Sequence, residues 1–506
     1  MKKFKKIICS IMCFFSVAAL ASCSLDELFG QAQKIFVDIN YYVDGTLVDF
    51  VTVLKGQKAV LELDEIFVYQ EDTTLDKYIE ARLGENQEFD YWYTDAQYQN
   101  KATADLVVLE ELDLYGKIVT KQSPNPNPNP NPTPNPGDGA IVETVIYDEL
   151  QLHFLELGNE YAGDCTYIKA GDTDILIDAG SRKGSATTIK QYVDQYCTDG
   201  KLEYVIATHA HQDHIAAFVG NSSGGKRTGI LYEYEVGTII DFSLTEATSQ
   251  IYEDYLTAVE KCVDAGAKHY TADQCWEQTD GASRSFVLAE GITLNILYNK
   301  YYFEEAPDEN DYSVCTMISY NDKHFMLTGD LEHEGEMEMA KYYDGSTPEK
   351  TLPHCVLFKA GHHGSASSSN EELLSKITPE IVTVCACAGS TEYTANYQTI
   401  FPTQAMIDRV AKYTDRVYVT SMFNETTKEF ESLNGNIIIS SNGSNIGVSA
   451  TNNITKLKDS AWFNETVYVV YSGAVGNITS GKGKEDFFTA STPNAVAVPR
   501  RVWPTV

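Results

Sequence analysis

From residue 141 onward, short apolar runs alternate with longer segments of mixed polarity. Runs such as Leu202–Ala207 and Val356–Phe358 are brief and bounded by polar or glycine-containing stretches, which favours buried strands. The segments Ala186–Tyr196, Glu371–Ile377 and Gln404–Tyr413 instead place apolar residues at helical spacing. Strands that alternate with helices predict an α/β domain, in which helices cover a sheet.

Residues 35–120 follow a different pattern, typical of a small β-rich module. Ile35–Ile39 alternates imperfectly between apolar and polar residues, and Asp44-Gly45 is a hairpin signal. The segments Trp92–Asp95 and Leu112–Lys117 resemble the small β-grasp repeat of internalin-type surface proteins. That resemblance implies a spacer or adhesion module without chemistry. An unrelated β-domain with the same turn spacing is the alternative.

Residues 121–139 form the link between these two patterns. Pro124–Pro136 is an Asn-Pro repeat, and proline fixes φ and lacks an N–H donor, so we expect a stiff, extended spacer. The chain then divides into the module at 35–120, the linker at 121–139 and a main domain at 140–450. A C-terminal extension at 451–506 offers one further strand, Val467–Tyr471.

The first 22 residues are typical of a bacterial lipoprotein signal peptide. Four lysines stand among the first six residues, and the apolar run Ile7–Leu20 is too short to span a membrane as a stable helix. Leu20-Ala21-Ser22-Cys23 resembles a lipobox. We therefore expect lipidation of Cys23, which would anchor the protein to the outer face of the cytoplasmic membrane. An ordinary secretory signal with a chance cysteine is the alternative.

Composition indicates a globular, strongly acidic protein. Hydrophobic residues make up 43% of the 506 residues, and 38 Lys and Arg stand against 72 Asp and Glu, a net charge of −34. Loss of residues 1–22 removes four lysines and no acidic residue, which takes the charge to −38. Affinity for nucleic acid comes largely from Lys and Arg on phosphates, so this charge disfavours nucleic acid as a partner.

The strongest chemical signal is the cluster of three histidines and one aspartate in His209–His214, directly after an apolar run. In an extended backbone His209 and His211 point the same way, while Asp213 and His214 project from the following turn. Two histidines for one ion and an Asp-His pair for another predict a binuclear centre for zinc, manganese or iron. A histidine-rich surface loop is the alternative.

His209–His214 resembles the HxHxDH signature of the metallo-β-lactamase superfamily. Three further segments follow the order of that superfamily: Asp174–Gly180, His324–Asp330 and Val356–Ser365. Thr-Gly-Asp followed by His-His-Gly-Ser, together with Gly163–Cys165, is similar to one branch, the extracellular domain of the DNA-uptake channel ComEC and its relatives. The resemblance implies an αββα sandwich with its metals at one edge.

The resemblance also implies six metal ligands. These are His209, His211, Asp213, His214, Asp330 and His362. In this assignment His209 and His211 hold the first metal, Asp213 and His214 hold the second, and Asp330 bridges both.

The roles of three further residues follow from the same resemblance. His362 completes the second site and His363 faces the substrate, although the reverse order is left open. Asp178 accepts a hydrogen bond from a ligand imidazole and so fixes its tautomer. The centre is expected to hold one or two zinc ions, with manganese or iron as alternatives.

The first site departs from the superfamily pattern. Many members have a further histidine between the HxHxDH loop and the bridging aspartate, but His269 and His324, the two histidines in that interval, match no motif. Asn310-Asp311-Tyr312-Ser313 falls near this point instead. We expect an under-ligated first site, filled by water, Asn310 or Asp311.

Two other features have two interpretations each. Gly220–Glu305, a long segment rich in tyrosine and acidic residues, is either a lid or wall of the substrate site or surface decoration. Most cysteines of the mature chain, including Cys385 and Cys387, lie in or beside apolar runs and are expected to pack in the core. Cys262 with Cys275 is the one disulfide worth testing.

These features predict a surface-anchored, metal-dependent hydrolase that acts on a phosphodiester through a metal-bound hydroxide. Asp213 would orient that nucleophile, while His363, Ser365 and Ser367 would contact the phosphate. The substrate is DNA or RNA in the ComEC-like interpretation, or a choline-phosphate or teichoic-acid ester of the envelope. The alternatives are an idle surface-binding protein on a hydrolase scaffold and a ComEC-like extracellular nuclease.

Overall fold

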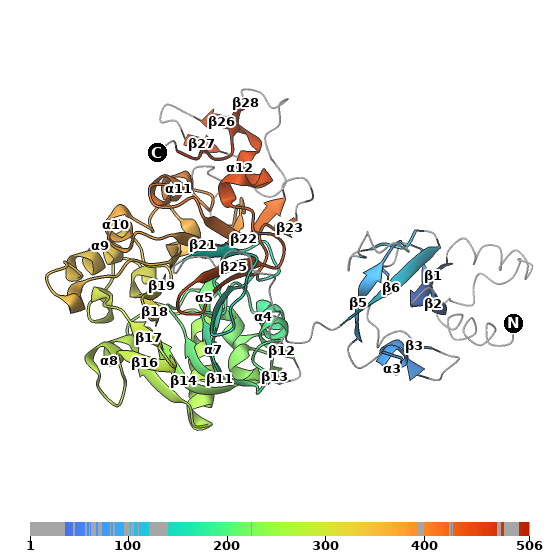
Figure 1. Cartoon of the computed structure of the whole chain (residues 1–506), viewed down its shortest axis with the longest axis horizontal. Helices are drawn as coiled ribbons and strands as arrows, with labels where there is room; N and C mark the ends of the chain where they lie inside the picture. Colours follow the sequence, from blue (N-terminus) through green and yellow to red (C-terminus); the bar gives the residue numbers. More distant parts are fainter. Residues whose placement is uncertain are drawn as a thin grey trace, which may run out of the picture. The chain divides into compact units, whose positions relative to one another are not determined.

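The computed structural model describes two compact units, which divide the chain after Thr133. It covers residues 36–120 with several short gaps, residues 140–472 apart from 224, 393–398, 425–426 and 428, and residues 477–479 and 495–504. The expected signal peptide at 1–22, the lipidation site Cys23 and the linker at 121–139 lie outside the described residues. Figure 1 shows the two units.

The first unit is built on a four-stranded mixed sheet in the order β2-β1-β6-β5. Its elements are β1 (Phe36–Val43), β2 (Thr46–Leu54), β3 (Phe67–Val68), β4 (Thr73–Thr74), α3 (Leu75–Glu80), β5 (Gln87–Tyr93) and β6 (Leu112–Thr120). The central pair β1–β6 is parallel, and the outer pairs are antiparallel. With one helix between its two hairpin-like halves, this order is that of the expected β-grasp arrangement.

The core of this small unit forms around one tryptophan. Trp92 is fully buried, packs edge-on against Tyr41 and Phe89, and donates a hydrogen bond from Nε1 to the Leu61 carbonyl over 3.0 Å. Leu75 and Ile79 of α3 join the same cluster. A buried aromatic side chain with its polar atom satisfied stabilises this small sheet.

The second unit contains two large sheets. The nine-stranded sheet has the order β15-β14-β11-β10-β9-β8-β24-β25-β7, and the eight-stranded sheet has the order β16-β17-β18-β19-β20-β21-β22-β23. The strands of the first are β7 (Ile141–Glu143), β8 (Leu150–Phe154), β9 (Thr166–Ala170), β10 (Thr173–Ile177), β11 (Lys201–Ile206), β14 (Glu235–Asp241), β15 (Lys268–Thr271), β24 (Ile437–Ser441) and β25 (Ile446–Ala450). Those of the second are β16 (Ser285–Ala289), β17 (Ile292–Ile296), β18 (Thr316–Tyr320), β19 (Lys323–Leu327), β20 (Leu357–Lys359), β21 (Ile381–Ala388), β22 (Val417–Asn424) and β23 (Glu429–Ser432).

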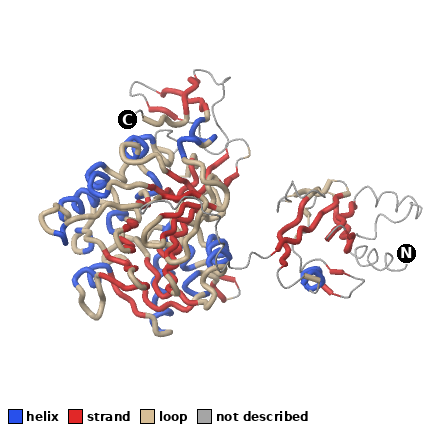
Figure 2. The backbone as a smooth tube through the Cα atoms, in the orientation of Figure 1, coloured by secondary structure: helices blue, strands red, loops and turns tan. Residues whose placement is uncertain are grey.

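Helices cover the outer faces of both sheets (Figures 1 and 2). They are α4 (Ser185–Val193), α5 (Gln212–Val219), α6 (Ile230–Glu233), α7 (Gln250–Asp264), α8 (Ala272–Glu277), α9 (His333–Tyr342), α10 (Glu371–Ile377) and α11 (Gln404–Val410). One core joins inward side chains of both sheets and includes α4, α5 and α7, while a second lies between the eight-stranded sheet and α9, α10 and α11. The predicted α/β fold, an αββα sandwich after a small β-rich module, is confirmed.

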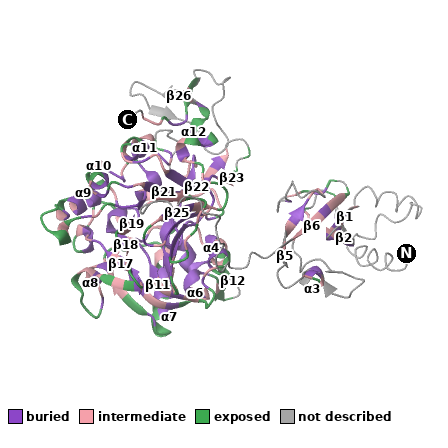
Figure 3. Cartoon of the chain, in the orientation of Figure 1, coloured by how far each residue is buried: buried purple, intermediate pink, exposed green. Residues whose placement is uncertain are grey.

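Alternation along β20 shows how the strand serves both cores. Leu357 belongs to the core between the sheets, and Phe358 belongs to the outer core. Figure 3 shows buried residues along the strands of this unit and exposed residues at its surface. Lys359, two residues after Leu357, therefore points into the space between the sheets, because side chains alternate with period two. A lysine in that position is buried, with 2% of its surface exposed.

The long segment Gly220–Glu305 is not surface decoration. Its strands β14 and β15 extend the nine-stranded sheet beside β11, and β16 and β17 form one end of the eight-stranded sheet. Helix α7 packs against α5, which carries part of the histidine motif. The expectation of surface decoration is thus corrected, because these strands complete the two sheets of the sandwich.

The C-terminal extension adds a small three-stranded sheet, β26 (Thr466–Ser472), β27 (Asn477–Thr479) and β28 (Ala495–Pro499), after helix α12 (Ala461–Asn464). Arg501 ties its end to the domain by donating to the carbonyls of Ile400 and Pro402 over 2.6 and 2.8 Å. Within the described part of the chain, no helix is long and apolar enough to cross a membrane.

The described cysteines are all buried and free, including Cys262 and Cys275. The disulfide considered between these two is therefore not formed in this structure. Cys385 lies in the core between the sheets, which is the packing role expected for it. Burial raises the pKa of the Cys275 thiol to about 12, so it stays protonated at neutral pH.

Candidate metal centre

The candidate metal centre forms where strand ends of the two sheets meet. On the nine-stranded sheet, Asp164 lies just before β9, Asp178 follows β10, and His209–His214 follow β11. On the eight-stranded sheet, Asp330 follows β19 and His363 follows β20. Parallel neighbours such as β10–β11 and β19–β20 bring their carboxyl ends to one edge.

The loop after β10 lies against the backbone of the histidine motif. A Cβ atom at Gly180 would stand 1.5 Å from the Asp213 carbonyl oxygen, so only glycine allows this approach. The neighbouring Ala179 N–H donates to the His214 carbonyl over 2.7 Å. Helix α5 begins at Gln212, and these contacts fix its first turn, which carries Asp213 and His214.

Four side chains converge on one buried point. Nε2 of His214 lies 3.0 Å from Oδ2 of Asp330, and Nε2 of His363 lies 3.2 Å from the same oxygen. Nε2 of His363 is also 3.3 Å from Oδ2 of Asp213. Two imidazole nitrogens and two carboxylates form a ligand set suited to zinc and to other first-row transition metals.

The contacting atoms are arranged for a common third partner. Nε2 of His214 and Nε2 of His363, which approach Oδ2 of Asp330, are buried, and neither makes a hydrogen bond of good geometry within the described residues; the same is true of Oδ1, the other oxygen of Asp330. The close N–O pairs are therefore near one another without being aligned as donor and acceptor. Buried polar atoms without partners are rare in proteins, and atoms directed at one point fit a metal ion.

The tautomer of His214 is fixed by a hydrogen bond at Nδ1 of its ring. Its Nδ1 lies 2.7 Å from Oδ2 of Asp178, and that carboxylate accepts further hydrogen bonds from the Thr208 N–H and hydroxyl, each over 2.8 Å. This is the contact that the sequence led us to expect of Asp178. With Nδ1 engaged, Nε2 is left free for a metal.

His209 and His211 form a separate pair beside this cluster. Nε2 of His209 lies 3.0 Å from Nδ1 of His211, and the ring centroid of His209 is 4.2 Å from that of His214. His209 is fully buried, whereas His211 is partly exposed. The pair is placed where the sequence predicted the first metal, next to the ligands of the second.

The residues considered as substitutes for a missing first-site ligand lie elsewhere or are engaged. His269 pairs with Asp241 over 2.9 Å, and His324 contacts the Ser319 hydroxyl over 3.0 Å. Oδ1 of Asp311 accepts the N–H groups of Glu332 and Gly335 at the start of α9, so this oxygen is already engaged.

Asn310 remains as a candidate for the first site. Its Oδ1 is buried and has no hydrogen-bond partner among the described residues, while its Nδ2 donates to Glu332 over 3.2 Å.

The two adjacent histidines occupy different environments. His363 is fully buried in the cluster, whereas His362 retains 23% side-chain exposure and its Nδ1 lies 2.7 Å from Oε1 of Glu332. Both residues adopt a positive φ, 44° and 52°, a strained conformation, and their rings meet edge to face with centroids 5.9 Å apart. These contacts favour His363 as the ligand, with His362 partly exposed beside it, which is the alternative order that the sequence left open.

Sequence reasoning missed two residues of the centre, Asp164 and Lys359. Asp164, grouped with His214, Asp330 and His363 within 4.8 Å, approaches His363 from the Nδ1 side, 3.2 Å from that atom. Lys359 pairs with Asp164 and lies 3.8 Å from Oδ1 of Asp330. Although burial opposes ionisation, Lys359 and His363 hold the pKa of Asp164 below its usual value. The motif Gly163–Cys165 was the only signal for this carboxylate.

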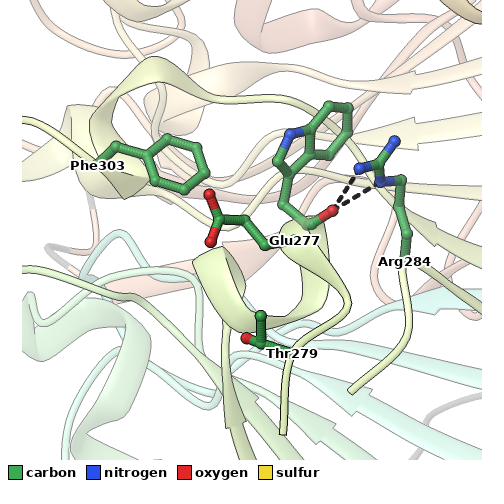
Figure 4. Close-up of a pocket in the computed structure, with 5 residues that line it drawn as sticks. Glu277, Thr279, Arg284 and Phe303 are labelled. Carbon is green, nitrogen blue, oxygen red and sulfur yellow. Dashed lines mark hydrogen bonds between the residues drawn. The ribbon is translucent and has the colours of Figure 1, made fainter. Parts of the chain in front are cut away.

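An open hollow of about 520 Å³ lies elsewhere on the second unit (Figure 4). Trp276, Glu277, Thr279, Arg284 and Phe303 line it. The Arg284 guanidinium stacks over the Trp276 ring at 3.7 Å and donates to its carbonyl, so its polar groups are largely used within the protein. None of the centre's ligands contributes to this hollow.

Comparison with known proteins agrees with this geometry. The sequence profile of the metallo-beta-lactamase superfamily matches residues 158–220, which contain the histidine motif. ComE operon protein 3 of Bacillus subtilis (strain 168) is 25% identical over 189 residues, 37% of this chain and 20% of that protein. Competence protein ComA of Neisseria gonorrhoeae is 25% identical over 243 residues, 48% of this chain and 27% of that protein.

Solved structures with a similar fold include the metallo-beta-lactamase fold protein YhfI from Bacillus subtilis, with a TM-score of 0.31, 12% identity, and coverage of 53% of this chain and 95% of that one. A probable metal-dependent hydrolase from Staphylococcus aureus has a TM-score of 0.21, 12% identity, and coverage of 37% of this chain and 74% of that one.

The larger unit has the fold of the metallo-β-lactamase superfamily, and its residues 158–220 match the profile of that superfamily, whose members are mostly metal-dependent hydrolases and typically bind zinc. Within that superfamily the chain is similar to competence proteins of the ComEC type, and it spans about a quarter or less of the length of those relatives.

Proposed function

We propose that the protein is a metal-dependent phosphodiesterase held at the outer face of the cytoplasmic membrane. The observation that carries the hydrolase assignment is the convergence of His214, His363, Asp213 and Asp330 on one buried point, with Nε2 of both imidazoles free. A binding scaffold without turnover does not need such a ligand set, which argues against an idle surface protein.

The residues around this point have separate roles in the proposed hydrolysis. A metal ion held there would supply Lewis acidity toward a phosphoryl oxygen and toward water. Asp213 is the most exposed of the four side chains, at 12%, so it can accept a hydrogen bond from a water molecule. His362, beside it at the surface, can donate to a phosphate oxygen.

The hydroxyls of Ser365 and Ser367, expected from the sequence to contact the phosphate, have partners within the protein. Ser365 is buried, and its Oγ lies 2.8 Å from that of Ser367. Ser367 donates to Oε1 of Glu332 over 2.9 Å, the same oxygen that contacts His362. The serines therefore hold Glu332, and through it His362, in place.

The acidic charge supports a small phosphodiester as substrate. With 72 Asp and Glu against 38 Lys and Arg, few ammonium or guanidinium groups are free to follow a polyanion. A choline-phosphate or teichoic-acid ester of the envelope fits this better than DNA. A nuclease is the second candidate function, and it is favoured by the similarity to two competence proteins.

Hydrolysis of a chromogenic phosphodiester and of long DNA should be compared at low and high salt. We expect cleavage of the small ester, little gain for DNA and a shallow salt dependence, because each phosphate contact would add about 0.9 to the slope of log K against log salt. Asp330→Ala should abolish activity and metal content together. A large preference for DNA that collapses with salt would instead support the nuclease.

A further inference from the structure

The metal centre concentrates negative charge in the protein interior. Four carboxylates surround the cluster: Asp164, Asp178, Asp213 and Asp330, with side-chain exposures of 3%, 2%, 12% and 2%. Buried carboxylates are costly unless they are paired and hydrogen-bonded. Before a metal ion binds, some other positive group must offset this charge.

Lys359 supplies such a charge from the end of β20. Its Nζ pairs with Oδ2 of Asp164, lies 3.8 Å from Oδ1 of Asp330, and donates to the carbonyls of Gly329 and Ala360, each over 3.2 Å. An ammonium has three donors, and one carboxylate with two carbonyls uses all of them. The group is therefore fixed in position as well as charged.

The contacts of Lys359 involve Asp164 and Asp330 but not Nε2 of His214 or of His363. Asp164 stands on the Nδ1 side of His363, at 3.2 Å, where the Cys385 carbonyl also contacts Nδ1 at 2.9 Å. Nε2, on the other side of the ring, faces Asp213 and Asp330. The chain Lys359–Asp164–His363 therefore ends at a free metal-ligating nitrogen.

We propose that Lys359 is a positioning residue that preassembles the metal centre: it offsets the buried carboxylate charge before a metal binds and orients His363 through Asp164. This inference rests on the proposed function only in that the cluster binds a metal ion. It predicts a protein that folds without metal and loads it afterwards, unlike domains whose folding requires the ion.

The test is thermal unfolding of the purified protein with a chelator and with zinc. Wild type should unfold cooperatively in chelator and gain stability with zinc. Lys359→Met should lose more Tm in chelator than in zinc, so the rise in Tm on adding zinc becomes larger than in wild type. Phe358→Leu, on the same strand but facing the outer core, should lower Tm equally in both conditions.

A double variant separates charge from packing. If Lys359→Met leaves Asp164 unpaired, then Asp164→Asn in the same chain should restore part of the stability lost in chelator, because no buried charge then lacks a partner. The double variant also tests the proposal if Lys359→Met alone fails to fold.

Two results would overturn the proposal. One is an equal loss of Tm by Lys359→Met with and without zinc; the other is a double variant no more stable in chelator than the single one. If the Tm of the wild type did not respond to zinc, both the metal-centre assignment and this proposal would be wrong. If zinc raised the Tm as expected but no phosphodiester were hydrolysed, only the substrate assignment would be wrong.

Discussion

At the scale of single residues, the centre depends on which nitrogen of each imidazole is left free. Asp178 engages Nδ1 of His214, and Asp164 with the Cys385 carbonyl engages Nδ1 of His363. Both Nε2 atoms then face Asp330. Partners on the far side of a ligand imidazole fix its tautomer and orientation, so these buried carboxylates matter as much as the ligands themselves.

The two adjacent histidines should separate metal binding from turnover. His363→Ala removes a buried Nε2 that faces two carboxylates, so we expect metal affinity to fall by at least about 100-fold, the upper end of the cost of losing an outer partner. His362→Ala should keep its metal and lose activity. Metal content by elemental analysis, beside the hydrolysis rate, checks both. Metal retained by His363→Ala and lost from His362→Ala would restore the order expected from the sequence.

His153, which lies outside the metal centre, makes the stability of the folded protein depend on pH. His153 of β8 is fully buried between Tyr192 and Gln151, and burial lowers its pKa to about 3. The unfolded chain binds a proton near pH 6.5 that the folded chain does not. Stability from this group is therefore complete above pH 6.5 and is lost as pH falls toward 3.

Unfolding in urea at several pH values measures this effect. His153→Gln should flatten the dependence of unfolding free energy on pH between 6.5 and 3, because glutamine does not titrate. An unchanged slope in the variant would mean that other groups control acid unfolding.

At the scale of elements, a side chain of helix α9 caps the N-terminal end of helix α10. Glu336 of α9 is fully buried and accepts the N–H groups of Ser369 and Asn370, each over 2.7 Å, at the start of α10. The residue before α10, Asn370, makes no capping hydrogen bond with its own side chain. A carboxylate from a neighbouring helix therefore satisfies the free donors at this helix start.

Loss of this contact should be costly. Glu336→Ala would leave two buried N–H donors unpaired, and we expect a loss of about 2 kcal/mol in unfolding free energy. Glu334→Ala, exposed on the same helix, should change stability by less than about 0.5 kcal/mol. Chemical denaturation of the two variants against wild type compares them. Equal effects of both substitutions would show that the helix, and not the cap, is responsible.

At the scale of the whole molecule, two compact units share one chain, and a proline-rich segment separates them in the sequence. The larger unit carries the centre, and the smaller one contains no group of three potential metal ligands among its described residues. This division fits a spacer module and a separate hydrolase. We propose that the lipobox-like segment before them anchors both to the membrane.

The anchoring proposal predicts the fate of Cys23. In the native host, Cys23→Ala should release the protein from the membrane or block its processing, since no lipid can then attach. Membrane fractionation with mass spectrometry of the mature N-terminus measures this. A wild-type N-terminus at another residue, with no lipid attached, would contradict the lipoprotein assignment.

Much of the centre follows from local sequence alone. His209, His211, Asp213 and His214 stand within six residues, so a strand and a turn bring their side chains together wherever that segment lies. Asp178, Asp330 and the histidine pair each end an apolar strand, and the carboxyl ends of neighbouring parallel strands share an edge. The sandwich fold could also be predicted from the sequence, because alternating strands and helices can form only a few layered arrangements.

The packing of the two sheets decided the rest. Lys359 and Asp164 lie on different sheets, far apart in the chain, and no spacing rule pairs them; β20 buries the lysine because it shares a face with Leu357. The order of His362 and His363 depends on two left-handed residues in a turn, which periodicity does not predict. Local spacing determines which residue types gather, whereas long-range contacts between sheets determine which atoms remain free for a metal.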